Sequence, residues 1–102
     1  MTVLGVDPGT ATTGLGVVRN SQGNAIECIS YSCITTPKEK KPGERLVLLE
    51  KELLQVLQDY KPDAVVVERL YFFKNLKSAM PVSEARGVIL LAIAKKKLPV
   101  FE

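Results

Sequence analysis

The stretch Val3-Leu4-Gly5-Val6-Asp7-Pro8-Gly9-Thr10 decides the fold of this chain. Its first four residues are apolar, and Pro and Gly follow, which is the pattern of a short buried strand that ends in a turn. Asp7 therefore stands where the strand gives way to the loop. Because open α/β sheets bind their ligands at the carboxyl ends of strands, this position suits a functional carboxylate.

A second apolar run, residues 64–67, repeats this pattern and ends in Glu68. Both runs are of the all-apolar kind found in a parallel sheet that is covered on both faces. Each acid has an ordinary alternative, since Asp7 can cap the turn and Glu68 can be an exposed acid at a strand end. Two such strands side by side would nevertheless bring two carboxylates together, and a cation between them relieves their repulsion. The pair favours a metal or catalytic site.

The 102 residues fit one small domain, so we expect residues 1–102 to form a single unit. Hydrophobic residues at 46% and charged residues at 25% are ordinary globular values. No stretch reaches the roughly 18–20 apolar residues of a membrane span, and the N-terminus lacks the features of a signal peptide. We therefore expect a cytoplasmic protein with no membrane partner.

The two cysteines, Cys28 and Cys33, lie five residues apart in one predicted strand. We expect their side chains to point to opposite faces and to form no disulfide, and free thiols fit a reducing cytoplasm. The chain has no His, which disfavours zinc. Any metal is expected to be a hard ion held by oxygen atoms, Mg²⁺ first and Mn²⁺ as the alternative.

The remaining pattern predicts a mixed sheet with the order β-β-β-α-β-α-β. A turn signal at 20–24 pairs the second strand with the third as antiparallel neighbours, and helical crossovers add the later strands in parallel. Placing the fourth strand beside the first puts Asp7 next to Glu68. Pro81 fits either the first turn of the second helix or a kink within it. The expected strands are 2–7, 15–19, 25–36, 64–68 and 98–101. The first expected helix follows the loop 37–43 and ends before Pro62, and the second spans 82–97.

The net charge of +3 permits a polyanionic partner without requiring one. A cluster at 95–97 suits the C-terminal end of a helix, whereas the clusters in the loop 37–43 and after Glu68 can contact a phosphate backbone. The basic residues of these last two clusters are Lys38, Lys40, Lys41, Lys74 and Lys77.

The sequence resembles the RuvC family, the bacterial Holliday junction resolvases with a ribonuclease-H-like fold. The resemblance covers essentially the whole chain, and its motifs in this order and spacing are highly specific. The matching blocks are Leu4-Gly5-Val6-Asp7-Pro8-Gly9-Thr10, Thr13-Gly14-Leu15-Gly16, Pro62-Asp63-Ala64 through Val67-Glu68, Lys74-Asn75, Ser78-Ala79, Glu84-Ala85-Arg86-Gly87-Val88 and Leu98-Pro99-Val100-Phe101-Glu102.

The resemblance implies a homodimeric, Mg²⁺-dependent endonuclease. Such an enzyme nicks two strands of like polarity symmetrically in a four-way DNA junction, and it works with a branch-migration helicase complex. Asp7 and Glu68 match the first two catalytic carboxylates of the family, which implies that they bind the metal. The helix 82–97 is the candidate dimer interface, with packing on the sheet as the alternative.

The resemblance also implies residues that contact DNA. Tyr71 falls where the family carries an aromatic residue that stacks on junction bases, and a role as a partly exposed packing residue is its alternative. Lys74 and Lys77 follow on the same loop, where phosphate contacts are expected. Arg86 matches a family Arg, with a structural role in the helix as the alternative.

The remaining catalytic acids of the family lie on a C-terminal helix beyond Glu102. We therefore expect this chain to lack that helix, to expose apolar surface on one sheet face, and to be inactive or nearly so by itself. Glu102 is not a substitute, because it lies in or just after an edge strand. Pro81 departs from the regular helix that the family has there.

Two other functions compete with this hypothesis. The first is an actin-like or sugar-kinase-like domain, in which the hairpin that starts at Asp7 binds phosphate through backbone amides. That hypothesis leaves Glu68 without a clear role and needs a second domain. The other is a DNA-binding module without catalytic activity.

Overall fold

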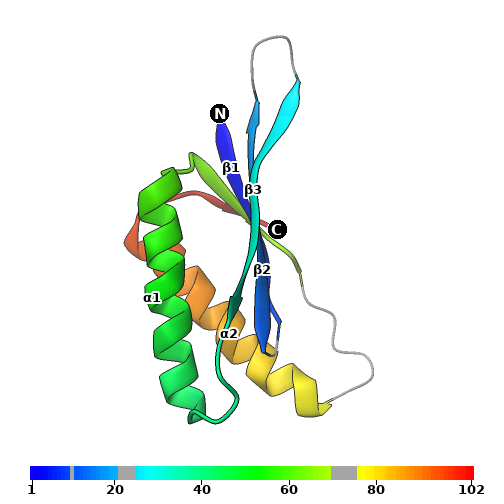
Figure 1. Ribbon diagram of the computed structural model, residues 1–102, viewed down its shortest axis with the longest axis vertical. Helices are drawn as coiled ribbons and strands as arrows, with labels where there is room; N and C mark the ends of the chain where they lie inside the picture. Colours follow the sequence, from blue (N-terminus) through cyan, green and yellow to red (C-terminus); the bar gives the residue numbers. More distant parts are fainter. Residues whose placement is uncertain (10, 21–24, 70–75) are drawn as a thin grey trace.

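The computed structural model describes residues 1–9, 11–20, 25–69 and 76–102, with only the backbone of 76–78. Within these ranges a five-stranded sheet has the strand order β3-β2-β1-β4-β5, and two helices pack against it (Figure 1). No helix among the described residues is long and apolar enough to cross a membrane. The elements are β1 (Thr2–Asp7), β2 (Thr12–Asn20), β3 (Ile26–Thr35), α1 (Pro42–Tyr60), β4 (Ala64–Val67), α2 (Leu76–Lys95) and β5 (Val100–Phe101).

The sheet is mixed, as the sequence predicts. β1 and β2 are antiparallel, and so are β2 and β3, which form a long hairpin. β4 joins the other side of β1 in parallel, and β5 joins β4 in parallel. The predicted element order, the mixed sheet and the placement of the fourth strand beside the first are all confirmed.

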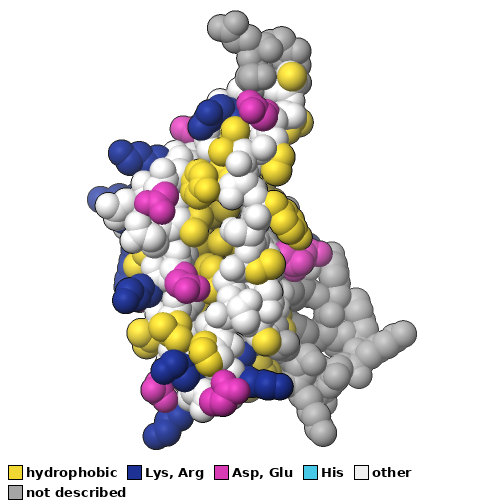
Figure 2. Space-filling model, viewed as in Figure 1, with side chains coloured by type: hydrophobic (Ala, Val, Ile, Leu, Met, Phe, Trp, Pro, Cys, Tyr) yellow, Lys and Arg dark blue, Asp and Glu magenta, His cyan; other side chains and the backbone are white. Residues whose placement is uncertain are grey.

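The core lies between the two helices and one face of the sheet. Alternate residues of the strands face the helices because successive side chains of a strand point to opposite faces. Charged side chains, with some apolar ones among them, lie on the side of the molecule that α1 forms (Figure 2). The core side chains include Leu4, Val6, Leu15, Val17, Leu49, Leu53, Leu57, Val65, Val67, Ile89, Ala92 and Ile93.

The opposite face of the sheet carries no helix within the described residues. Val66 of β4 and Phe101 of β5 are partners on this face, and their side chains are 41% and 58% exposed. Tyr31 of β3 is also exposed, opposite Gly16 of β2. The expectation of exposed apolar surface on one face is therefore confirmed. The described residues do not form the sheet covered on both faces that the apolar strands suggested.

Both helices begin earlier than the sequence pattern predicts. α1 starts at Pro42, inside the predicted loop, because a Pro in the first helical turn loses no hydrogen bond. The backbone N–H of Lys41 donates to the Glu44 carboxylate at 3.2 Å and so supports this start. α2 starts at Leu76 and contains Pro81 in its interior, where the ring removes one backbone donor. The alternative that Pro81 lies in the first turn of this helix is thus wrong.

A β-bulge changes the predicted orientation of the cysteines. The pairing of β2 with β3 shifts between Val17 and Val18, which leaves Ile29 as the extra residue. Cys28 is therefore opposite Val18 and Cys33 opposite Gly14, so both thiols lie on the same face of the sheet, about 13 Å apart along the strand. The prediction of opposite faces is wrong, and the prediction of free thiols is confirmed.

We expect Leu53→Ala to lower the free energy of unfolding by about 2–5 kcal/mol, because Leu53 of α1 is 0% exposed and its truncation leaves a cavity. Val47 lies on the same helix but is 66% exposed, so Val47→Ala should change stability by less than about 0.5 kcal/mol. Urea denaturation of both variants measures the difference. Equal losses would show that α1 does not pack as described.

Candidate active site

Asp7 and Glu68 lie side by side at one edge of the sheet. Asp7 is the last residue of β1, and Glu68 follows the last residue of β4. The parallel pairing sets Val6 beside Val67, and the Glu68 N–H donates to the Val6 carbonyl at 2.9 Å. Neighbouring strands are about 4.8 Å apart, so the two carboxylates reach the same point. The predicted adjacency is confirmed.

The two acids interact electrostatically. A hydrogen bond with the Asp7 carboxyl raises the pKa of Glu68 above its ordinary value, and the negative charge of Asp7 and partial desolvation raise it further. Both residues are exposed, so solvent attenuates this repulsion. A cation held between the carboxylates would remove the repulsion and replace it with attraction.

The donor chemistry fits Mg²⁺ or Mn²⁺. Two carboxylates supply hard oxygen ligands and stand open to solvent, which suits ions that keep several water ligands. Among the described residues no cluster of three or more His, Cys, Asp or Glu side chains could hold a metal. Asp7 and Glu68 alone could therefore supply only part of a ligand set, with coordination positions left for water, phosphate oxygens or further acids.

Two glycines shape the surroundings of Asp7. A side chain at Gly9 would collide with the carbonyl oxygen of Thr12, so the turn after Asp7 requires glycine there. Gly14 is the β2 partner of Asp7, and a Cβ at Gly14 would lie 3.6 Å from the Asp7 Cβ. Because Gly14 has no side chain, the carboxylate stays accessible along the sheet face. In the sequence, the glycine directly after Thr13 was the feature that could have indicated this open space beside Asp7.

The predicted DNA-contacting residues have different outcomes. Tyr71 and Lys74 lie outside the described residues, and for Lys77 only the backbone, in the first turn of α2, is described. Arg86 of α2 forms an ion pair with the carboxylate of Glu102, which ties the helix to the end of β5. This pair supports the structural alternative for Arg86, while its contact with DNA stays a prediction.

The mixed sheet with an acid at the exit of each of its two central parallel strands defines a ribonuclease-H-like domain. The model of the family described as crossover junction endodeoxyribonuclease RuvC matches residues 3–102. The chain belongs to the RuvC family.

Individual relatives agree with this assignment. The chain is 46% identical over 102 residues to a crossover junction endodeoxyribonuclease RuvC of Thermosipho melanesiensis, covering 100% of this chain and 64% of that protein. It is 44% identical to the one of Petrotoga mobilis, covering 62% of it. A solved structure of T. thermophilus RuvC in complex with Holliday junction substrate matches with a TM-score of 0.89 and 30% identity, over 98% of this chain and 63% of that chain. The chain thus spans less than two thirds of the length of the relatives it matches.

We expect Asp7→Asn to lower the pKa of Glu68 toward its ordinary value, because the substitution replaces the carboxyl group that hydrogen-bonds Glu68 and removes the neighbouring charge. A raised folded-state pKa means that the folded protein holds the proton more tightly than the unfolded chain. The free energy of unfolding therefore falls as the pH rises from 4.5, the pKa of Glu68 in the unfolded chain, through its raised pKa in the folded protein. This fall should be smaller in Asp7→Asn. NMR titration of the Glu68 carboxyl carbon measures the shift.

Asp59→Asn is the matched control, because Asp59 lies on α1 and accepts a hydrogen bond from Gln55. This substitution should leave the titration of Glu68 unchanged. An unaltered Glu68 pKa in Asp7→Asn would show that the two carboxylates do not interact.

Proposed function

We propose that the whole protein is a structure-specific endonuclease that resolves four-way DNA junctions by symmetric nicking. The observation that carries this proposal is the Asp7–Glu68 pair, set at the exits of β1 and β4 in a chain of the RuvC family. The T. thermophilus relative that shares this fold was solved with a Holliday junction substrate, which supports the choice of DNA. We place the protein in the cytoplasm, with a branch-migration helicase complex as its partner.

The pair would hold the divalent metal, Mg²⁺ or Mn²⁺. When bound, such ions supply an activated water and stabilise the leaving oxygen of a phosphodiester. The chain provides the rigid positions that this chemistry needs. Asp7 is fixed by its pairing with Gly14 of β2 and by the turn at Gly9 that follows it, and Glu68 is fixed by the hydrogen bond from its N–H to the Val6 carbonyl. Both carboxylates face solvent, where a phosphate backbone can approach them.

The ligand set of the described residues is incomplete, since two acids leave most metal positions to other groups. We propose that a C-terminal helix of the whole protein supplies further acids. On this proposal the 102-residue chain binds junctions without cutting them. Junction contacts would come from Tyr71, Lys74 and Lys77, which follow the β4 exit in the sequence and stand close to Glu68 in chain order.

We further propose that the outer face of α2 forms a homodimer interface. Met80 and Leu91 are 69% and 51% exposed, and Gly87 between them is also exposed. Their spacing puts them along one helix face, and a glycine at the centre allows a second helix to approach closely. A symmetric enzyme of this kind would present two metal sites to the two strands of a junction.

In the whole protein, we expect Asp7→Asn and Glu68→Gln each to abolish Mg²⁺-dependent nicking of a synthetic four-way junction while junction binding persists. Each change removes a direct metal ligand, so the loss should exceed the roughly 10–100-fold cost of losing an outer-shell partner. Gel assays of cleavage and of binding, run on the same samples, separate the two effects.

Glu39→Gln is the matched control, because it removes one charge from the exposed loop before α1. It should retain cleavage. An active Asp7→Asn or Glu68→Gln enzyme would refute the metal-site assignment. Nicking by the 102-residue chain alone would refute the need for further acids.

We expect Leu91→Glu to convert the whole protein to monomers, because two copies would bury like charges against each other at the proposed interface. Val47→Glu makes the same change at an exposed apolar position on α1 and should leave the dimer intact. Sedimentation velocity distinguishes the two species. Dissociation by Val47→Glu alone would place the interface on α1 instead.

A further inference from the structure

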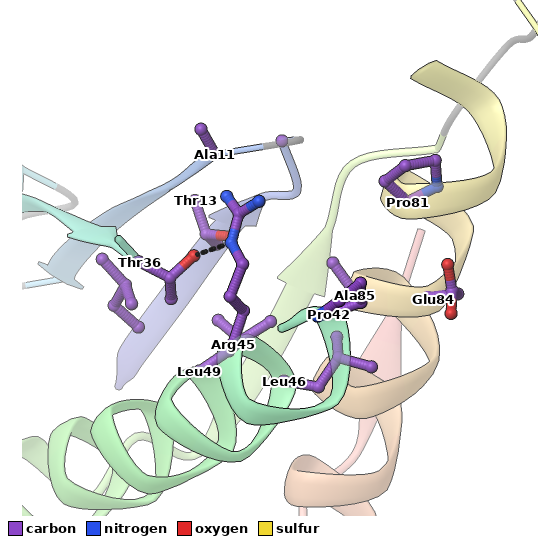
Figure 3. A pocket seen from close by; sticks show the side chains of 12 residues that line it. Ala11, Thr13, Thr36, Pro42, Arg45, Leu46, Leu49, Pro81, Glu84 and Ala85 are labelled. Atoms are coloured by element: carbon purple, nitrogen blue, oxygen red, sulfur yellow. Dashed lines mark hydrogen bonds between the residues drawn. The ribbon is translucent and has the colours of Figure 1, made fainter. Parts of the chain in front are cut away.

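A pocket of about 150 Å³ lies on the helical side of the turn that follows β1 (Figure 3). The turn, the end of β3 and the starts of α1 and α2 enclose it, and one side opens to solvent. Most of its wall is apolar. Besides Ala11, the apolar side chains that line it are Ile34, Pro42, Leu46, Leu49, Pro81 and Ala85.

A positive charge is built into this apolar wall. Arg45 of α1 is half-buried, and its Nε donates to the hydroxyl oxygen of Thr36 at 3.0 Å. This bond orients the planar guanidinium, whose terminal nitrogens point past Thr13 toward Ala11 in Figure 3. A guanidinium carries five N–H donors in a fixed fork, so it can serve several acceptors at once and match a carboxylate with two parallel bonds.

Two further features of the pocket wall determine where the negative group of a ligand would lie. Glu84 of α2 also lines the pocket, on the side away from Arg45 in Figure 3. The first turn of α1, which begins at Pro42, adds the positive end of a helix dipole to the side that Arg45 occupies. A ligand would therefore direct its negative group to Arg45 and its apolar part to the remaining wall.

We propose that this pocket binds a small aromatic carboxylate, with the carboxylate on Arg45 and the ring against the apolar wall. The volume suits one six-membered ring, since an apolar cavity of about 150 Å³ in another protein binds benzene. The pocket is separate from the metal site, although Gly9 and Ala11 of the same turn line it. The proposal goes beyond the nuclease function and does not depend on it.

The test is an NMR titration of the 102-residue chain with sodium benzoate, benzyl alcohol and benzylamine. We expect benzoate to bind most tightly and to shift the amide signals of Ala11 and Thr36. Arg45→Met should weaken benzoate binding by at least about tenfold, because it removes charge-assisted hydrogen bonds and keeps a long side chain. Glu84→Gln should strengthen it, because it removes a negative charge from the pocket.

Lys40→Gln is the matched control, because it removes one positive charge from the neighbouring exposed loop. In about 0.15 M salt, which screens long-range attraction, it should leave benzoate affinity within about twofold of the unaltered chain. Equal losses in Arg45→Met and Lys40→Gln would overturn the proposal. The proposal would also be overturned if the unaltered chain bound benzylamine more tightly than benzoate. The same holds if benzoate shifted only amide signals of another surface.

Discussion

The parallel ladder between β1 and β4 is the interaction on which the rest of the structure depends. It aligns Val3 with Ala64 and Val6 with Val67, so the two strands end at the same edge of the sheet. The side-chain period of a strand is two residues, so a slip by one residue would turn the core-facing side chains of β4 to the open face. The same slip would separate Glu68 from Asp7. Register thus fixes the hydrophobic core and the carboxylate pair together.

The core supplies the energy that holds two like charges together. Leu4, Val65 and Val67 are fully buried between the sheet and the helices, and each such side chain contributes about 1.5–3 kcal/mol on burial. The acids extend past the buried part of their strands and remain exposed, so solvent attenuates their repulsion. The site is therefore placed by apolar packing and does not require its own polar interactions to form.

Local patterns in the sequence predicted most of the fold and the central feature of the site. Apolar runs that end in Asp7 and Glu68 located both strands, and their shared exit followed from crossover rules. Features set by a single extra residue or by tertiary packing were missed. The bulge at Ile29 leaves no clear signal in strand periodicity, and it reversed the predicted orientation of Cys28. Packing of α2 against the core tolerates Pro81 inside the helix, against its intrinsic propensity.

The uncovered sheet face links the apolar surface to the chemistry of the acids. Val66 precedes Glu68 by two residues and shares its face of the sheet, so exposed apolar surface extends from Val66 and Phe101 toward the carboxylates. Any element that covers this surface would also exclude water from the acids. Desolvation raises the pKa of a carboxylate, so covering the face would add to the effect that Asp7 already has on Glu68. The covered pair would then depend more strongly on a cation, so the proposed metal binding would be coupled to completion of the sheet packing.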